Sequence, residues 1–214
     1  MDIRFLGQVE FTEAWKLQKQ LVEDRSRGLV PDTLLLLEHP PVYTCGASSR
    51  QTPPPGLPYP YHVIERGGDA TYHGPGQLVG YPIVHLGKRG LGAVDHIRLI
   101  EAALIKTAAH YGLQAEAIAG FTGVWSGGKK IASIGVAVRR NVAYHGFALN
   151  VSCELAPFYR INPCRLEPEQ MGTLAKIAQR PILVSDASRV AAAAFEETFR
   201  TAWAAAPRPV AQAA

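Results

Sequence analysis

The chain has 214 residues, with 22 Lys or Arg and 18 Asp or Glu, so its formal net charge is +4. A hydrophobic fraction of 47% fits a globular core and argues against a chain that is disordered as a whole, and the length fits one domain at about 150 residues per domain. Three cysteines form no CxxC pair, which favours a reducing compartment. Residues 1–7 show no apolar segment typical of a signal peptide, and the apolar runs are far shorter than the ~20 residues that a membrane helix needs. We therefore expect a cytoplasmic protein without a membrane partner, and the scattered basic pairs predict no nucleic-acid partner.

Hydrophobic periodicity predicts secondary structure along most of the chain. In chain order, it predicts a helix at 11–27, a strand at 33–38, a proline-rich loop at 51–61, a strand at 78–85, a helix at 95–111, a hairpin with strands at 130–140 and 145–151, and helices at 173–179 and 185–205. Asp95 is the expected cap of its helix, and residues 139–141 form the expected hairpin turn. The order predicts a single-domain α+β fold: a mixed, mostly antiparallel sheet flanked by helices. We expect the domain to span residues 1–206, followed by a disordered tail at 207–214.

Two glycine-rich segments have the composition of binding loops. Residues 66–77 hold four glycines, one proline and six polar or ionisable side chains. Glycine lets a ligand approach the backbone closely, so this segment predicts a binding loop. Residues 123–130 contain the GxxxxGK core of a phosphate loop, but Lys130 occupies the Ser/Thr position and a strand follows. We therefore expect no nucleotide there, and interpret Gly127-Gly128 as a hairpin turn.

A free cysteine is the candidate nucleophile. Cys164 follows Pro163, which fixes its own φ and restricts Asn162 before it, and so presents the thiol on a stiff, irregular segment. Spacing alone gives Cys164 only a small advantage over Cys45, and each of the three cysteines, including Cys153, could equally be a buried hydrophobe.

A thiol of pKa about 8.5 needs a neighbouring group to become a thiolate at neutral pH. The candidate helpers are Lys129, Lys130, His73 and His145. Lys130 precedes the apolar Ile131 and is expected to be partly buried, whereas Lys129 is expected to face water. Both histidines could equally be structural. No histidines or cysteines have the close spacing of metal ligands, so we expect no metal.

The motifs together resemble the lipoyl(octanoyl) transferase family over residues 34–181. The matching segments are LEHPPVYT at 37–44, RGG at 66–68 and HGPGQ at 73–77, VGYP at 79–82, GVW at 123–125, KIASIG at 130–135, YHGFALN at 144–150 and INPC at 161–164. The family usually has Gly after the nucleophilic cysteine, where this chain has Arg165.

The resemblance implies the catalytic fold shared with biotin and lipoate protein ligases, and an acyl transfer that needs no cofactor. It implies Cys164 as the acyl-thioester nucleophile and Lys130 as the residue that activates it. The substrate contacts that it implies are Arg66, Gly67, Gly68, Asp69, Ala70, Thr71, Tyr72, His73, Ser133, Ile134, Gly135, Gly146, Phe147 and Ala148. The implied donor is octanoyl-acyl carrier protein. The implied acceptors are lipoyl domains of 2-oxoacid dehydrogenases and the glycine-cleavage H protein. We expect a monomer.

Two alternatives stay open at this point. An ATP-dependent lipoate or biotin ligase of the same fold would need ATP and would not need Cys164. A non-catalytic module that binds acyl carriers or lipoyl domains would show no turnover. We also expect Gly135 and Gly146 to leave room for an acyl tail, and backbone N–H groups near Gly135 or in the loop that begins at Arg66 to hold the oxyanion.

Overall fold

The structure is a computed structural model that describes residues 1–47, 49, 52–161 and 168–205. Cys164, Arg165 and the predicted tail at 207–214 therefore lie outside the described residues. The elements are β1 (Asp2–Gln8), α1 (Phe11–Arg27), β2 (Thr33–Glu38), β3 (Val42–Gly46), β4 (Tyr61–Ile64), β5 (Thr71–His73), β6 (Gln77–His85), η1 (Gly87–Arg89), α2 (Ala93–His110), β7 (Ala115–Ile118), β8 (Phe121–Ser126), β9 (Lys129–Arg139), β10 (Val142–Asn150), η2 (Ala156–Arg160), η4 (Pro168–Gln170), α3 (Leu174–Ala178) and α4 (Val184–Ala205).

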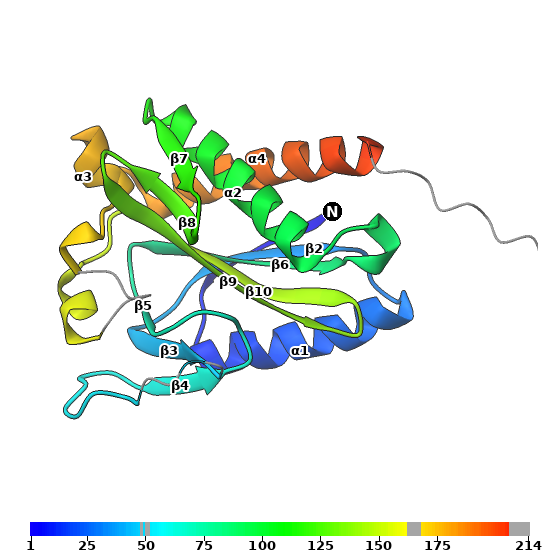
Figure 1. Ribbon diagram of the computed structural model, residues 1–214, viewed down its shortest axis with the longest axis horizontal. Coiled ribbons are helices and arrows are strands. Elements are labelled where there is room, and N and C mark those ends of the chain that lie inside the picture. The colour runs from blue at the N-terminus through cyan, green and yellow to red at the C-terminus, as the bar shows by residue number, and fades with distance from the viewer. Residues whose placement is uncertain (48, 50–51, 162–167, 206–214) are drawn as a thin grey trace, which may run out of the picture.

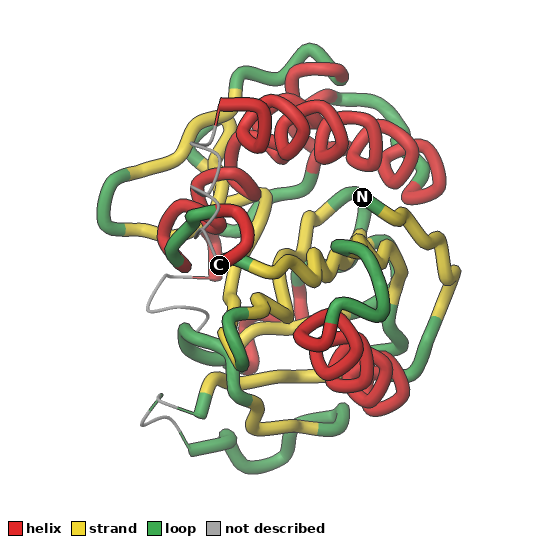
Figure 2. The backbone as a smooth tube through the Cα atoms, turned by 90° about the vertical axis from the view of Figure 1, so that its right-hand side faces the viewer, coloured by secondary structure: helices red, strands yellow, loops and turns green. Residues whose placement is uncertain are grey.

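Two sheets organise the described residues, and helices cover both faces of the larger one (Figures 1 and 2). The larger sheet has the order β1-β2-β6-β10-β9-β8-β7, and the smaller has the order β4-β3-β5. In the larger sheet β1 and β2 are parallel and the other neighbours are antiparallel. The predicted α+β class, with a mostly antiparallel sheet between helices, is confirmed.

The leucine run of β2 is apolar at successive positions because both faces of its sheet are buried. Leu34 and Leu36 pack with α2 and α4 in one core, whereas Leu35 and Leu37 pack with α1 in a second core. Strand geometry places alternate residues on opposite faces, so one short run contributes to both cores. A third cluster, between the small sheet and η2, includes Tyr43 and Phe158.

Most predicted boundaries lie within two residues of those observed. Helix α1 has the predicted bounds, and Gly28 ends it with a φ of 80°. Asp95 is not the N-cap of α2: the helix begins at Ala93, and the Asp95 carboxylate accepts from the Gly92 N–H at 2.8 Å. An acidic residue at the third helical position reaches back to the cap in this way. The predicted β9–β10 turn is confirmed, because Arg140 and Asn141 both have positive φ, as a two-residue hairpin turn requires.

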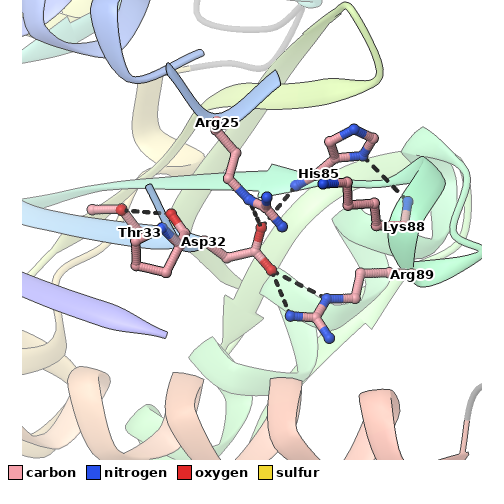
Figure 3. A network of polar contacts seen from close by, with 7 residues as sticks. Arg25, Asp32, Thr33, His85, Lys88 and Arg89 are labelled. Carbon is pink, nitrogen blue, oxygen red and sulfur yellow. Dashed lines mark hydrogen bonds and ion pairs between the residues drawn. The ribbon is translucent and has the colours of Figure 1, made fainter. Parts of the chain in front are cut away.

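A buried ion-pair network fixes Asp32, which directly precedes β2, to the elements α1, β6 and η1 (Figure 3). One Asp32 oxygen accepts from Arg25 Nε of α1 at 2.7 Å and from the backbone N–H of His85 at 3.0 Å. The other accepts from Nε and Nη2 of Arg89 at 3.1 and 2.9 Å. The Arg89 guanidinium also lies 3.8 Å from the ring centroid of Trp203 in α4. This network joins helices on both faces of the sheet.

Candidate active site

A cavity lies between the first residue of α1, the small sheet and the central strands β6, β9 and β10. It encloses about 480 Å³, including its open mouth. The lining residues are Phe11, Ile64, Arg66, Gly68, Thr71, His73, Tyr81, Ser133, Ile134, Gly135, His145, Gly146, Phe147 and Ala148. Aliphatic and aromatic side chains supply much of this lining, which suits an apolar chain.

Most of the predicted substrate contacts come together at this cavity. Ten of them line it: Arg66, Gly68, Thr71, His73, Ser133, Ile134, Gly135, Gly146, Phe147 and Ala148. Gly67 and Asp69 line a neighbouring cleft instead. Ala70 and Tyr72 lie in the core between the small sheet and η2, and line neither space. Phe11, Ile64 and Tyr81 also line the cavity, although no motif in the sequence predicts them.

The neighbouring cleft contains Lys130. It encloses about 710 Å³, including open space, and shares Gly68, Ile134 and Gly135 with the apolar cavity. Lys130 is only 3% exposed, and its Nζ lies 4.9 Å from the ring centroid of Trp125. Lys130, which was expected to be partly buried, is almost fully buried, and Lys129 is exposed as predicted. The cleft that contains the Lys130 amine therefore adjoins the apolar cavity.

A chain of buried hydrogen bonds begins at Arg66 and fixes the ring of His73. Nη2 of Arg66 donates to both the backbone carbonyl and Oγ1 of Thr44, at 2.8 and 3.0 Å. Thr44 Oγ1 is 3.2 Å from His73 Nε2, and His73 Nδ1 is 2.8 Å from Gln77 Oε1. Because Gln77 Oε1 only accepts, His73 carries its proton on Nδ1, and Thr44 donates to Nε2. Burial lowers the pKa of His73 to about 3, so the ring is neutral at physiological pH.

The same series of hydrogen bonds continues from Gln77 to the strand that carries Lys130. Gln77 Nε2 donates to Tyr72 O and to Asn150 Oδ1, at 3.1 and 2.9 Å. Asn150 Nδ2 donates to Gly172 O at 3.1 Å, and the Gly172 N–H donates to Lys130 O at 3.0 Å. These directional bonds give the cavity wall and the backbone of Lys130 one rigid support.

His145 has an irregular backbone conformation within β10. The ladder between β10 and β6 is interrupted between the Ala143–Val84 and Phe147–Gly80 pairs, and Pro82, which has no N–H to donate, lies in the interrupted part of β6. His145 has a φ of 57°, and its own N–H donates to Gln18 Oε1 of α1 at 2.9 Å. Its Nε2 lies 3.5 Å from Glu65 Oε2. Burial lowers the pKa of His145 to about 4, so this ring is also neutral at physiological pH.

The two described cysteines behave as buried hydrophobes. Cys45 is 1% exposed within β3, in the core beneath the small sheet. Cys153 is 3% exposed, and burial raises its pKa to about 12, which makes its thiolate inaccessible near neutral pH. Neither fits the role of nucleophile. Within the described part of the chain, no cluster of three His, Cys, Asp or Glu residues has a metal-binding arrangement.

Gly135 and Gly146 do not leave the room that we predicted. A Cβ at Gly146 would lie 2.3 Å from the Gly80 carbonyl oxygen, and a Cβ at Gly135 would lie 2.8 Å from that of Gly67. Both glycines are needed because another backbone segment passes close to them. The space for a ligand lies beside them, against Ile134, Phe147 and Ala148.

Comparison with known proteins identifies the family. Residues 10–196 match the model of the lipoyl protein ligase A/B catalytic domain. An octanoyltransferase of Geobacter metallireducens is 48% identical over 91% of this chain and 92% of its own. One of Mycobacterium leprae is 42% identical over 93% of this chain and 88% of its own.

Solved structures show the same fold at low identity. A lipoate-protein ligase A bound with ATP is 17% identical, with a TM-score of 0.72 over 94% of this chain and 86% of its own. A biotin protein ligase from Aquifex aeolicus is 12% identical, with a TM-score of 0.55 over 96% of this chain and 72% of its own.

Among the described helices, none is both long and apolar enough to cross a membrane. The chain belongs to the octanoyltransferases, within the family that shares the lipoyl protein ligase A/B catalytic domain.

Proposed function

We propose that the chain transfers an octanoyl group from acyl carrier protein to a lysine of a lipoyl domain, through a thioester on Cys164. The observation that carries the proposal is the junction of the two spaces. An apolar cavity suited to an acyl tail meets, at Gly68, Ile134 and Gly135, a cleft lined by Lys130. Relatives named octanoyltransferase, 42–49% identical to the chain, support the same reaction.

The first half-reaction moves the acyl group from the carrier to the enzyme. The Cys164 thiolate attacks the thioester carbonyl carbon, and the carbonyl oxygen becomes an oxyanion. The carbon–sulfur bond to the carrier then breaks, and the carrier sulfur takes a proton from the Lys130 ammonium. The products are octanoyl-Cys164 and a free carrier thiol, with Lys130 left as the neutral amine.

The second half-reaction moves the acyl group to the acceptor. The lysine amine of the lipoyl domain attacks the octanoyl-Cys164 carbonyl and gives a proton to Lys130. The Cys164 sulfur leaves as the thiolate, an amide bond forms, and Lys130 is an ammonium again. The first half-reaction replaces one thioester by another, and the second replaces a thioester by a more stable amide. Neither step therefore requires ATP.

The substrates fit the described surfaces by their chemistry. The octanoyl tail would lie in the apolar cavity against Phe11, Ile134, Phe147 and Ala148. The acceptors that we propose are the lipoyl domains of 2-oxoacid dehydrogenases and the glycine-cleavage H protein. The net charge of +4 favours encounter with an acidic carrier protein at low ionic strength.

A transfer assay without ATP tests the function. The enzyme, octanoyl-acyl carrier protein and a lipoyl domain are mixed, and the mass of the lipoyl domain is followed. We expect octanoylation of its lysine in the absence of ATP. Transfer that occurs only from free octanoate with ATP would instead establish a ligase. Stoichiometric binding without any modification would establish a binding module.

A further inference from the structure

The cleft that contains Lys130 exists because β8 separates from β9. The two strands pair from Ser126 and Lys129 to Gly123 and Ser133, and among the described residues no further pair joins them. Strand β8 remains paired with β7 as far as Phe121. Phe121 and Thr122 on one side and residues 134–136 on the other then form the walls of the cleft.

Gly123 is the point at which β8 turns away. Its φ is 135°, in a region that disfavours side chains. Its N–H donates at 3.2 Å to the buried carboxylate of Glu101 in α2, rather than extending the ladder. A Cβ at this position would lie 2.4 Å from Ala132 O and 2.8 Å from Lys130 Cε. The opening is therefore built into the strand and supported from α2.

The separation leaves a strand edge beside Lys130. Past Ser133, the β8-facing edge of β9 has one described backbone contact, in which the Gly67 N–H donates to Val136 O at 3.0 Å. An extended chain that carries amides can bind such an edge through main-chain-like hydrogen bonds. The cleft adjoins the acyl cavity at Ile134 and Gly135, so a chain that fills both spaces passes over this edge.

We propose that the cleft between β8 and β9 holds the amide-bearing pantetheine arm that presents the acyl thioester. This inference rests on the proposed octanoyl transfer, because it assigns the other end of the same donor. With the tail in the apolar cavity and the carbonyl near Lys130, the thiol side of the thioester extends along the cleft. Thr122 is exposed and lines the cleft but not the acyl cavity, so it contacts the arm and not the tail.

Two small donors separate the arm from the acyl group. S-Octanoyl-pantetheine carries both amides of the arm, whereas the ethyl thioester of octanoic acid carries neither. The measured quantity is the ratio of kcat/KM for the pantetheine donor to that for the ethyl donor, with a lipoyl domain as acceptor. We expect the wild-type ratio to be at least about tenfold, as hydrogen bonds to two amides imply.

Thr122→Trp fills the cleft and should reduce this ratio at least about fivefold. Leu29→Trp is the matched control, because Leu29 is exposed and lines neither space, and it should keep the wild-type ratio. Circular dichroism establishes that both variants fold. A Thr122→Trp ratio equal to that of the wild type, or a wild-type ratio near one, would overturn the assignment of the cleft. A wild-type enzyme that uses neither these donors nor octanoyl-acyl carrier protein would refute octanoyl transfer itself.

Discussion

Replacing Asp32 by Asn should destabilise the protein strongly, although the two side chains have almost the same shape. The Asp32 side chain is 1% exposed, and its partners Arg25 and Arg89 are 9% and 32% exposed. In Asp32→Asn, the buried Arg25 guanidinium loses its counterion. The new side-chain amide also turns an N–H toward one of the N–H groups from which the carboxylate accepted. Breaking a buried pair in this way costs about 3–5 kcal/mol.

Urea unfolding and thermal melts measure this effect. For a chain of this size, about 2–4 °C of Tm corresponds to each kcal/mol, so we expect a decrease in Tm of roughly 6–20 °C. Asp2→Asn is the control, because the Asp2–Arg4 pair is 39% and 38% exposed and should contribute less than about 1 kcal/mol. Equal decreases in Tm for Asp32→Asn and Asp2→Asn would show that burial does not increase the contribution of the ion pair.

The effect of Asp32→Asn should also depend on pH. Burial by itself raises the pKa of Asp32, but hydrogen bonds from His85, Arg25 and Arg89 outweigh it and hold the pKa below its ordinary value. The ionised group therefore stabilises the fold above its unfolded pKa of about 3.9. This contribution disappears as the pH falls through the lower folded pKa, so the difference between wild type and variant should shrink in strong acid.

Three further predictions concern the site and the core. Lys130→Met should lower octanoyl transfer about 10²–10⁴-fold, as loss of a general acid and base does, and a rate near that of the wild type would contradict its role. Ala148→Leu narrows the acyl cavity, so the kcat/KM ratio of hexanoyl to octanoyl donors should rise; an unchanged ratio would place the tail elsewhere. Burial lowers the pKa of His96 to about 4, whereas the unfolded value is about 6.5. Wild-type stability should therefore fall as the pH drops from about 6.5 to 4, by about 1.4 kcal/mol per unit for this one proton. His96→Leu should lose that slope in urea unfolding, and an unchanged slope would show that His96 does not cause it.

Local patterns predicted the elements whose signals are local. Helix α1 has an apolar stripe and a glycine stop, and β2 is a leucine run buried on both faces. The small sheet was not predicted, because β4 and β5 have four and three residues. The proline-rich loop separates β3 from β4 in the sequence, so no local pattern indicates that the two strands pair.

The candidate site was predicted where its residues lie in glycine-rich motifs, and less well elsewhere. Phe11, Ile64 and Tyr81 line the acyl cavity because the helix, the small sheet and β6 converge there, and no spacing in the sequence signals that convergence. The prediction that Gly146 leaves room for an acyl tail was wrong for a related reason. A missing side chain can make room for a ligand or for a neighbouring strand, and only the position of Gly80 decides between them.

The acyl-enzyme on Cys164 is the central claim, and intact-protein mass spectrometry tests it directly. Wild type, Cys164→Ser and Cys153→Ser are each mixed with octanoyl-acyl carrier protein without ATP. We predict a thiol-labile octanoyl adduct on wild type and Cys153→Ser, none on Cys164→Ser, and loss of the adduct when a lipoyl domain is added. An adduct that persists on Cys164→Ser, or transfer without any adduct and only with ATP, would contradict the account.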